Sequence, residues 1–195
     1  MYLYGASGHA KVIMDILEAN QIEIEGLIDD NPEVNELSGY PVFHQRDDLS
    51  PLIISIGNNR IRRMIAGKLK VEFGIAIHPS AIISPSVKIG EGTVIMPGVI
   101  INADVVIGKH CIINTGATID HECVIEDYCH IAPGVNISGC TTVGEGTWLG
   151  VGSCVIQGLH IGNNCMIGAG SVVVKDIPDA VIAFGNPCRV RKKNV

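Results

Sequence analysis

The sequence has no CxxC pair and no long apolar run, and each absence excludes a class of protein. Its seven cysteines are an odd number without metal-ligand spacing, so they predict reduced thiols and not a disulfide framework or a zinc site. No segment approaches the roughly 20 apolar residues of a membrane-spanning helix, and the opening MYLYGASGHAKV has no basic region leading into an apolar one. We therefore expect no membrane association and a cytoplasmic location.

Positive charge is also scarce. Fourteen Lys and Arg stand against 20 Asp and Glu, and the net charge of -6 argues against binding to nucleic acid or anionic membranes. Apolar residues, in contrast, make up 47% of the 195 residues, which is ample for a packed core in one large or two small domains.

An aliphatic residue recurs at every sixth position of the second half of the chain without interruption. The positions are Ile77, Ile83, Ile89, Ile95, Ile101, Ile107, Ile113, Ile119, Ile125, Ile131, Ile137, Val143, Leu149, Val155, Ile161, Ile167 and Val173. Four places later in each hexad stands a small or modest residue. A helix of about 3.6 residues per turn cannot keep one face apolar at this period, whereas short strands meeting at tight corners can. The pattern predicts a left-handed parallel β-helix over residues 77–195.

Two residue types fall into this register. Glycine often follows the aliphatic position, and we expect it to supply strained corner geometry at Gly90, Gly108, Gly144, Gly150, Gly162 and Gly168. Cys111, Cys123, Cys129 and Cys165 occupy the inward small position, where a thiol acts as a small hydrophobe. We assign no chemistry to any of the seven cysteines.

Residues 1–76 have a different pattern. An apolar strand, a glycine turn and an amphipathic helix are followed by IEIEGLIDD, a strand that ends in Asp29 and Asp30. A third strand, LIISIGNN, precedes a helix predicted over RIRRMIAGKLKVEF, residues 60–73. This order predicts a small Rossmann-like nucleotide-binding domain, because the turn suits a phosphate and the acid suits a ribose hydroxyl. The full GxGxxG motif is missing, which argues against NAD, and a glycine turn that merely joins strand to helix is the alternative.

The stretch ATIDHECVIEDYCH, residues 117–130, places His121 beside Glu122 outside the inward positions. A carboxylate in contact with an imidazole fixes its tautomer and raises its basicity, as a general base requires. We expect Asp120, Asn114 and His130 to lie nearby, and Gly139 to stack over His121 and leave room beside the ring. A solvated polar corner is the alternative. The histidines lack the short spacing of a metal site between subunits, so we predict no metal.

The motifs YGASGHAKV, LIDD, SIGNNRIR and DHECVIEDYCHIAPG together resemble the bacterial sugar acetyltransferases of the PglD and NeuD type. The resemblance spans essentially the whole chain. It implies a homotrimer that transfers acetyl from acetyl-CoA to the amino group of a nucleotide-linked amino sugar, of the UDP-4-amino-sugar type, in surface glycan or glycoprotein biosynthesis. It also implies an active site between two subunits.

The same resemblance implies roles for individual residues. His121 would be the base that deprotonates the sugar amine, and Glu122 would raise its basicity. The acetyl-CoA site would comprise His130, Val151 and Ala169. The nucleotide sugar would be held by Ser7, Gly8, His9, Asp29, Asp30, Gly57 and Asn58. Two alternatives remain open at this point: O-acetylation of sialic acid or another sugar, and a structural β-helix with a nucleotide-sensing domain.

Overall fold

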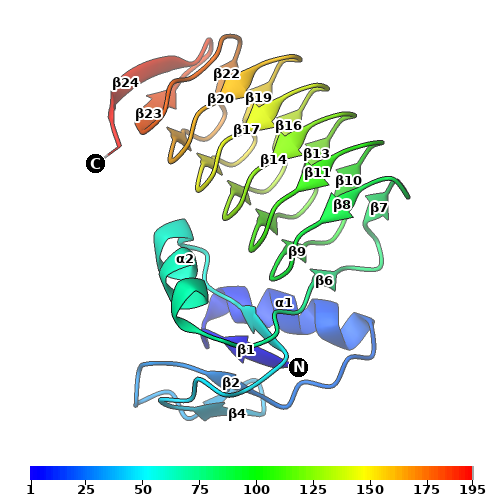
Figure 1. Ribbon diagram of the computed structural model, residues 1–195, viewed down its shortest axis with the longest axis vertical. Coiled ribbons are helices and arrows are strands. Elements are labelled where there is room, and N and C mark those ends of the chain that lie inside the picture. The colour runs from blue at the N-terminus through cyan, green and yellow to red at the C-terminus, as the bar shows by residue number, and fades with distance from the viewer. Residues whose placement is uncertain (195) are drawn as a thin grey trace.

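The computed structural model describes residues 1–194 and has two parts, a small α/β unit and a triangular β-helix that rises from it (Figure 1). The α/β unit holds strands β1 to β5 and both helices, and the β-helix begins at β6 (Ala76–Ile77). Within residues 1–194, neither helix combines the length and apolar character that crossing a bilayer requires.

The α/β unit has a five-stranded sheet in the order β3-β4-β2-β1-β5. Its elements are β1 (Tyr2–Tyr4), α1 (Gly8–Ala19), β2 (Gly26–Ile28), β3 (Glu36–Leu37), β4 (Tyr40–Phe43), β5 (Leu52–Ile54) and α2 (Asn59–Lys68). Strand β1 pairs in parallel with β2 on one side and β5 on the other, which confirms the predicted strand, turn and helix order. The sequence did not reveal the short hairpin of β3 and β4.

Helix α2 is shorter than the pattern predicted. It ends at Lys68, and Leu69 is already extended, with ψ 141°. The reason lies in the residues that follow, because Phe73 forms a parallel bridge with Leu52 at the end of the sheet. The predicted helical stretch of residues 69–73 is therefore wrong, since pairing with β5 competes with helix continuation.

The β-helix has three faces, and within each face the strands of successive coils run parallel. Face 1 is formed by β6 (Ala76–Ile77), β9 (Val94–Ile95), β12 (Ile112–Ile113), β15 (His130–Ile131), β18 (Trp148–Leu149) and β21 (Met166–Ile167), and is extended by β23 (Val181–Phe184) and β24 (Arg189–Lys193). Face 2 is formed by β7 (Ile82–Ile83), β10 (Ile100–Ile101), β13 (Thr118–Ile119), β16 (Asn136–Ile137), β19 (Cys154–Val155) and β22 (Val172–Val173). Face 3 is formed by β8 (Lys88–Ile89), β11 (Val106–Ile107), β14 (Val124–Ile125), β17 (Thr142–Val143) and β20 (His160–Ile161).

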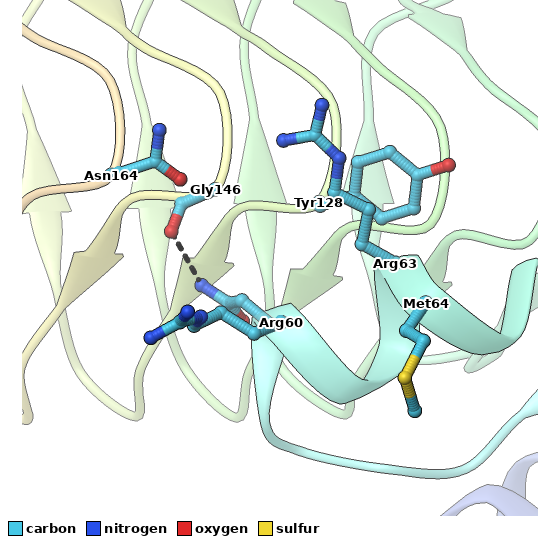
Figure 2. A pocket seen from close by; sticks show the side chains of 7 residues that line it. Arg60, Arg63, Met64, Tyr128, Gly146 and Asn164 are labelled. Atoms are coloured by element: carbon cyan, nitrogen blue, oxygen red, sulfur yellow. Dashed lines mark hydrogen bonds between the residues drawn. The ribbon is translucent and has the colours of Figure 1, made fainter. Parts of the chain in front are cut away.

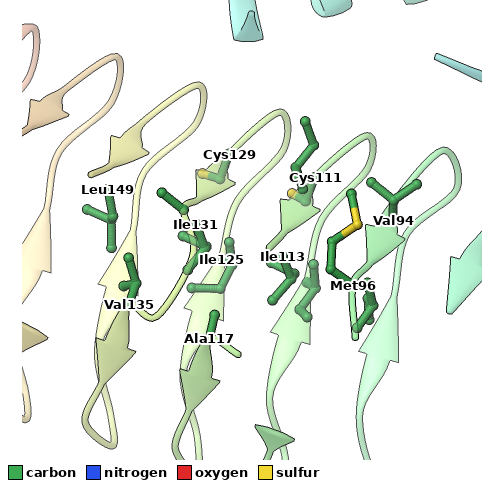
Figure 3. Packing of buried hydrophobic residues seen from close by; sticks show 14 of the residues in the cluster. Val94, Met96, Cys111, Ile113, Ala117, Ile125, Cys129, Ile131, Val135 and Leu149 are labelled. Atoms are coloured by element: carbon green, nitrogen blue, oxygen red, sulfur yellow. The ribbon is translucent and has the colours of Figure 1, made fainter. Parts of the chain in front are cut away.

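The predicted hexad register is confirmed. Aliphatic side chains such as Ile113 and Ile131 and the small inward residues Cys111 and Cys129 fill the interior of the prism (Figure 3). Each coil stacks its hexads on those of the next, as in the pairing of Ile113 with Ile131. The core is thus built by contacts between neighbouring coils, which is the physical basis of the repeat.

The expectation about the corner glycines is wrong. The left-handed backbone falls three places after the aliphatic residue, at positions such as Gly92 (φ 71°) and Glu122 (φ 57°). Glycines directly after the aliphatic residue have a different cause, because a Cβ on Gly90 would lie 2.6 Å from the carbonyl carbon of Gly108 in the next coil. These glycines allow close stacking of coils and do not form the turn.

The two parts share one continuous hydrophobic core. The buried residues of α1, including Ile13 and Ile16, belong to the same cluster as those of the first β-helix coils, including Ala76 and Val94. Asn20, which caps α1, donates its side-chain Nδ2 to the backbone oxygen of Ile77 at 2.8 Å. The α/β unit is therefore packed firmly against the start of the β-helix.

Candidate active site

The residues predicted to bind the nucleotide sugar follow the carboxyl ends of β1, β2 and β5, at one edge of the sheet. Parallel strands place such loops together, and β1 lies between the other two. Ser7 and Gly8 are exposed where α1 begins, and Ser7 makes no side-chain cap hydrogen bond. Their backbone N–H groups and the Ser7 hydroxyl are therefore available to a ligand, as a helix N-terminus at a phosphate site requires.

The two aspartates differ in what they contact. Asp29 accepts the backbone N–H of Ala6 at 2.7 Å and that of Asn31 at 2.9 Å, one on each carboxylate oxygen. Asp30 is exposed and, among residues 1–194, accepts only the Tyr4 hydroxyl, at 2.8 Å. Asp29 therefore holds the glycine turn against β2, whereas Asp30 has a carboxylate oxygen available for a ligand.

A buried arginine joins these loops to the β-helix. Arg62 is 1% exposed and lies on α2. Its guanidinium donates to the Asn59 side chain and to the backbone oxygens of Ile56, Gly57, His110, Tyr128 and Cys129, at 2.7 to 3.4 Å. Burial lowers its pKa to about 10, so it is charged at neutral pH. Sequence reasoning missed Arg62, because its partners in the β-helix lie in distant segments.

His130 lies beside Arg62, at the junction of the two parts. Its Nδ1 is 3.3 Å from the oxygen of Gly57, so this nitrogen carries the proton, and Nε2 accepts from the Asn114 amide at 3.1 Å. Burial lowers the pKa of His130 to about 4, and the positive charge of Arg62 adds to the shift. The ring is therefore neutral at pH 7.

His9 belongs to the same junction. Burial lowers its pKa to about 4, again with a contribution from Arg62. Its Nε2 atom is buried and has no hydrogen-bond partner among residues 1–194. A buried polar atom without a partner is uncommon and suits a ligand that supplies the missing contact.

Beyond His130, face 1 carries exposed side chains, including Trp148. The ring of Trp148 stacks on that of His130, with centroids 5.3 Å apart and an angle of 3°. Val151 and Ala169, predicted to line the acetyl-CoA site, are exposed and occupy equivalent corner positions in consecutive coils, where the backbone N–H of Gly170 donates to Val151. Trp148 was not singled out from the sequence, although it stands three positions before Val151.

His121 and Glu122 form the predicted pair at another corner of the prism. We call residues 121–122 and 139–140, which stack there between faces 2 and 3, the His121 corner. The Nδ1 of His121 lies 3.1 Å from Oε2 of Glu122, so it donates its proton there and Nε2 carries the free lone pair. Gly139 lies beside the ring as predicted, since a Cβ on it would come within 2.7 Å of Cε1 and Nε2.

The other side chains that we expected near His121 do not contact its ring. Asn114 and His130 contact each other on face 1 and do not contact His121. Asp120 accepts the backbone N–H of His121 at 2.8 Å and the Asn102 amide at 2.7 Å, so it shapes the corner without touching the ring. Cys140, to which we assigned no chemistry, places Sγ 3.6 Å from Oε2 of Glu122.

The surface has a groove beside His121 and a cavity beside α2. A groove of about 440 Å³ runs beside His121 over face 2, and it is lined by Ile82, Ile83, Ser84, Ile101, Asn102, Ala103, Asp120 and His121. A cavity of about 360 Å³ separates α2 from the corner that carries Tyr128 and Gly146, where the Asn59 amide donates to the Gly146 oxygen (Figure 2). Its lining contains none of the described residues that we predicted to hold a ligand.

Comparison with known proteins identifies related domains in both parts of the chain. Residues 1–69 match the PglD N-terminal domain, and residues 86–121, 104–139 and 140–175 match the bacterial transferase hexapeptide repeat. The solved structure of PerB from Caulobacter crescentus, in complex with CoA and GDP-perosamine, is 41% identical, with a TM-score of 0.93 over 97% of this chain and 96% of that one. The chain belongs to the PglD-type sugar N-acetyltransferases.

Other PglD-type structures extend the comparison. The acetyltransferase domain of PglB from Neisseria gonorrhoeae, in complex with acetyl coenzyme A, is 34% identical, with a TM-score of 0.89 over 97% of this chain and 98% of that one. A curated relative, uncharacterized protein L142 of Acanthamoeba polyphaga mimivirus, is 37% identical over 93 residues, and the match spans 19% of its length. The PglD-type fold is thus shared over nearly the whole chain with solved acetyltransferases.

Proposed function

We propose that the protein transfers acetyl from acetyl-CoA to the amino group of a nucleotide-linked amino sugar, with His121 as the general base. The observation that carries this proposal is the His121 ring, held through Nδ1 by Glu122 at 3.1 Å with its Nε2 lone pair free. The family supports the acyl donor and the acceptor, because its solved members bind CoA, acetyl-CoA and GDP-perosamine.

The reaction is a direct attack on the thioester. Nε2 of His121 takes a proton as the sugar nitrogen forms a bond to the acetyl carbon, and the bond between that carbon and the CoA sulfur breaks. The imidazolium then returns the proton to the departing thiolate. Glu122 keeps the ring in the correct tautomer and stabilises the imidazolium, and a backbone N–H near the thioester would stabilise the oxyanion. The reaction requires neither a metal nor a covalent enzyme intermediate.

The site is completed by a second copy of the chain, and we assign a homotrimer. His121 lies at the corner between faces 2 and 3, whereas the α/β unit and His130 lie along face 1, which is opposite that corner in a triangular prism. One chain therefore cannot bring His121 to a sugar held by its own loops. Ile82, Ile100, Val106 and Val124 are exposed on the two faces that meet at His121, and they suit an apolar interface.

The other predicted residues divide between the two substrates. Ser7, Gly8, Asp30 and Asn58 hold the nucleotide sugar, and Asp29 and Gly57 position these loops. His9 and His130 lie where sugar and thioester meet, and Val151 and Ala169 line the path of CoA. Because acetyl-CoA and nucleotide sugars are substrates of the cytoplasm, we place the protein there.

Product analysis by mass spectrometry, with UDP- and GDP-linked amino sugars and acetyl-CoA, tests the proposal. His121→Asn should lower kcat by about 10²- to 10⁴-fold, the usual contribution of a general base. His160→Asn, which changes an exposed histidine of face 3, is the matched control and should leave kcat unchanged. An acetyl group lost in mild base would indicate O-acetylation, and nucleotide binding without any product would indicate a sensing protein. Wild-type turnover by trimeric His121→Asn would refute the mechanism.

A further inference from the structure

Three metal-ligand side chains meet at the His121 corner. One ligand atom each from His121, Glu122 and Cys140 lies within 4.8 Å of the other two, and all three side chains are exposed. They supply an imidazole nitrogen, a carboxylate oxygen and a thiol sulfur, which is a ligand set that zinc accepts. We propose that this corner binds a divalent cation of the zinc class, and that the bound ion inhibits acetyl transfer.

The fold holds these groups in place. Glu122 and Cys140 occupy the same left-handed corner position in successive coils, with φ 57° and 56°, so their side chains leave the backbone in parallel. The backbone N–H of Cys140 donates to the oxygen of His121 at 2.9 Å, which fixes the two coils to each other. Preorganisation of this kind reduces the ordering cost of binding.

The separations match a tetrahedral zinc ion. Bonds of about 2.0 to 2.3 Å to nitrogen, oxygen and sulfur imply ligand separations of about 3.3 to 3.6 Å. The Nδ1 of His121 lies 3.1 Å from Oε2 of Glu122, and that oxygen lies 3.6 Å from Sγ of Cys140. The third separation, between a ring nitrogen of His121 and Sγ of Cys140, is within 4.8 Å, so a small rotation of the exposed side chains closes the site. A water molecule would take the fourth position.

Inhibition follows from which nitrogen is used. When Nδ1 of His121 binds the ion, the neutral ring carries its proton on Nε2, so the lone pair that would accept the amine proton is lost. The same ion withdraws the Glu122 carboxylate from the ring. This part rests on the proposed function, whereas metal binding itself does not.

Direct binding is measured by titrating untagged protein with zinc chloride against a chromophoric chelator, in a phosphine reductant in place of a thiol. We expect one zinc ion per chain. Cys140→Ser should weaken binding about tenfold or more, because a hydroxyl replaces the thiolate ligand. Cys154→Ser is the matched control, since Cys154 is half-buried on face 2 outside this cluster, and it should bind as wild type does.

A second measurement identifies the sulfur ligand. Cobalt(II) bound to the wild-type protein should give a sulfur-to-cobalt charge-transfer absorption that is absent from Cys140→Ser. Absence of zinc binding, or equal binding by wild type and Cys140→Ser, would overturn the site. In the transferase assay, saturating zinc should lower kcat about a hundredfold, EDTA should restore it, and Cys140→Ser should need about tenfold more zinc. Bound zinc with unchanged kcat would overturn the inhibition, while a protein inactive on every sugar would contradict only the proposed function.

Discussion

Replacement of Arg62 by methionine should be among the most damaging single changes in the protein. The guanidinium is 1% exposed and donates to five backbone oxygens from both parts of the chain. Methionine has a similar length but no hydrogen-bond donor, so these oxygens would be left buried without a hydrogen bond. Each orphaned group costs about 1–3 kcal/mol, and release of the buried charge offsets part of the sum. By analogy with the removal of one partner from a buried ionic network, we expect a net loss of about 3–5 kcal/mol.

Urea denaturation at pH 7 and equal protomer concentration measures this loss, since assembly also affects apparent stability. Arg60→Met is the matched control, because Arg60 is exposed on the same helix, and it should change the free energy of unfolding by about 0.5 kcal/mol at most. Arg62→Lys should be intermediate, because one ammonium group keeps the charge but cannot reach oxygens in three segments. Unfolding of Arg62→Met at the wild-type urea concentration would refute the view that this side chain joins the two parts.

Three further predictions concern pH, substrate binding and the His121 corner. Burial lowers the pKa of His110 to about 4, so between pH 6.5 and 4 the unfolded chain binds more protons than the folded protein does. The free energy of unfolding should therefore fall as the pH falls through this range. Asparagine tolerates the φ of 52° at this position, so His110→Asn should reduce the slope of stability against pH, measured by urea titration, by about one proton. Asp30→Ala should raise the KM for the sugar nucleotide and leave thermal stability unchanged, whereas Asp29→Ala should raise the KM and also lower the Tm. Identical behaviour of the two variants would contradict the separate roles of ligand binding for Asp30 and loop positioning for Asp29. Gly139→Ala should lower kcat by about tenfold or more, because its methyl group would meet the His121 ring 2.7 Å away, and wild-type kcat would show that the ring needs no such space.

The β-helix was predictable because its determinants are local and repeated. Each coil buries residues such as Ile113 and Cys129 against equivalent positions of the next, so the period of six appears in the sequence itself. The period does not reveal the backbone conformation within the hexad. Glycine at Gly90 reflects close contact between coils, whereas the left-handed corner at Gly92 tolerates Glu122 and Cys140 as well.

The site was predictable only in part, for a related reason. His121 and Glu122 are neighbours in the sequence, so their contact needs no knowledge of the fold. Cys140 could also have been placed, because it stands 18 positions after Glu122, the spacing of one coil. The contacts of Arg62 with His110, Tyr128 and Cys129 join segments 48 to 67 positions away and follow no repeat, so no pattern in the chain indicates them.

The two histidines of ATIDHECVIEDYCH, residues 117–130, illustrate how environment separates residues that the sequence presents alike. His130 is 8% exposed, its two nitrogens face Gly57 and Asn114, and its pKa is about 4, so it is a weak base with no free lone pair. His121 is exposed, contacts one carboxylate and keeps Nε2 free. Since a general base needs an accessible lone pair, we propose that proton transfer falls to His121 and that His130 shapes the place where the two substrates meet.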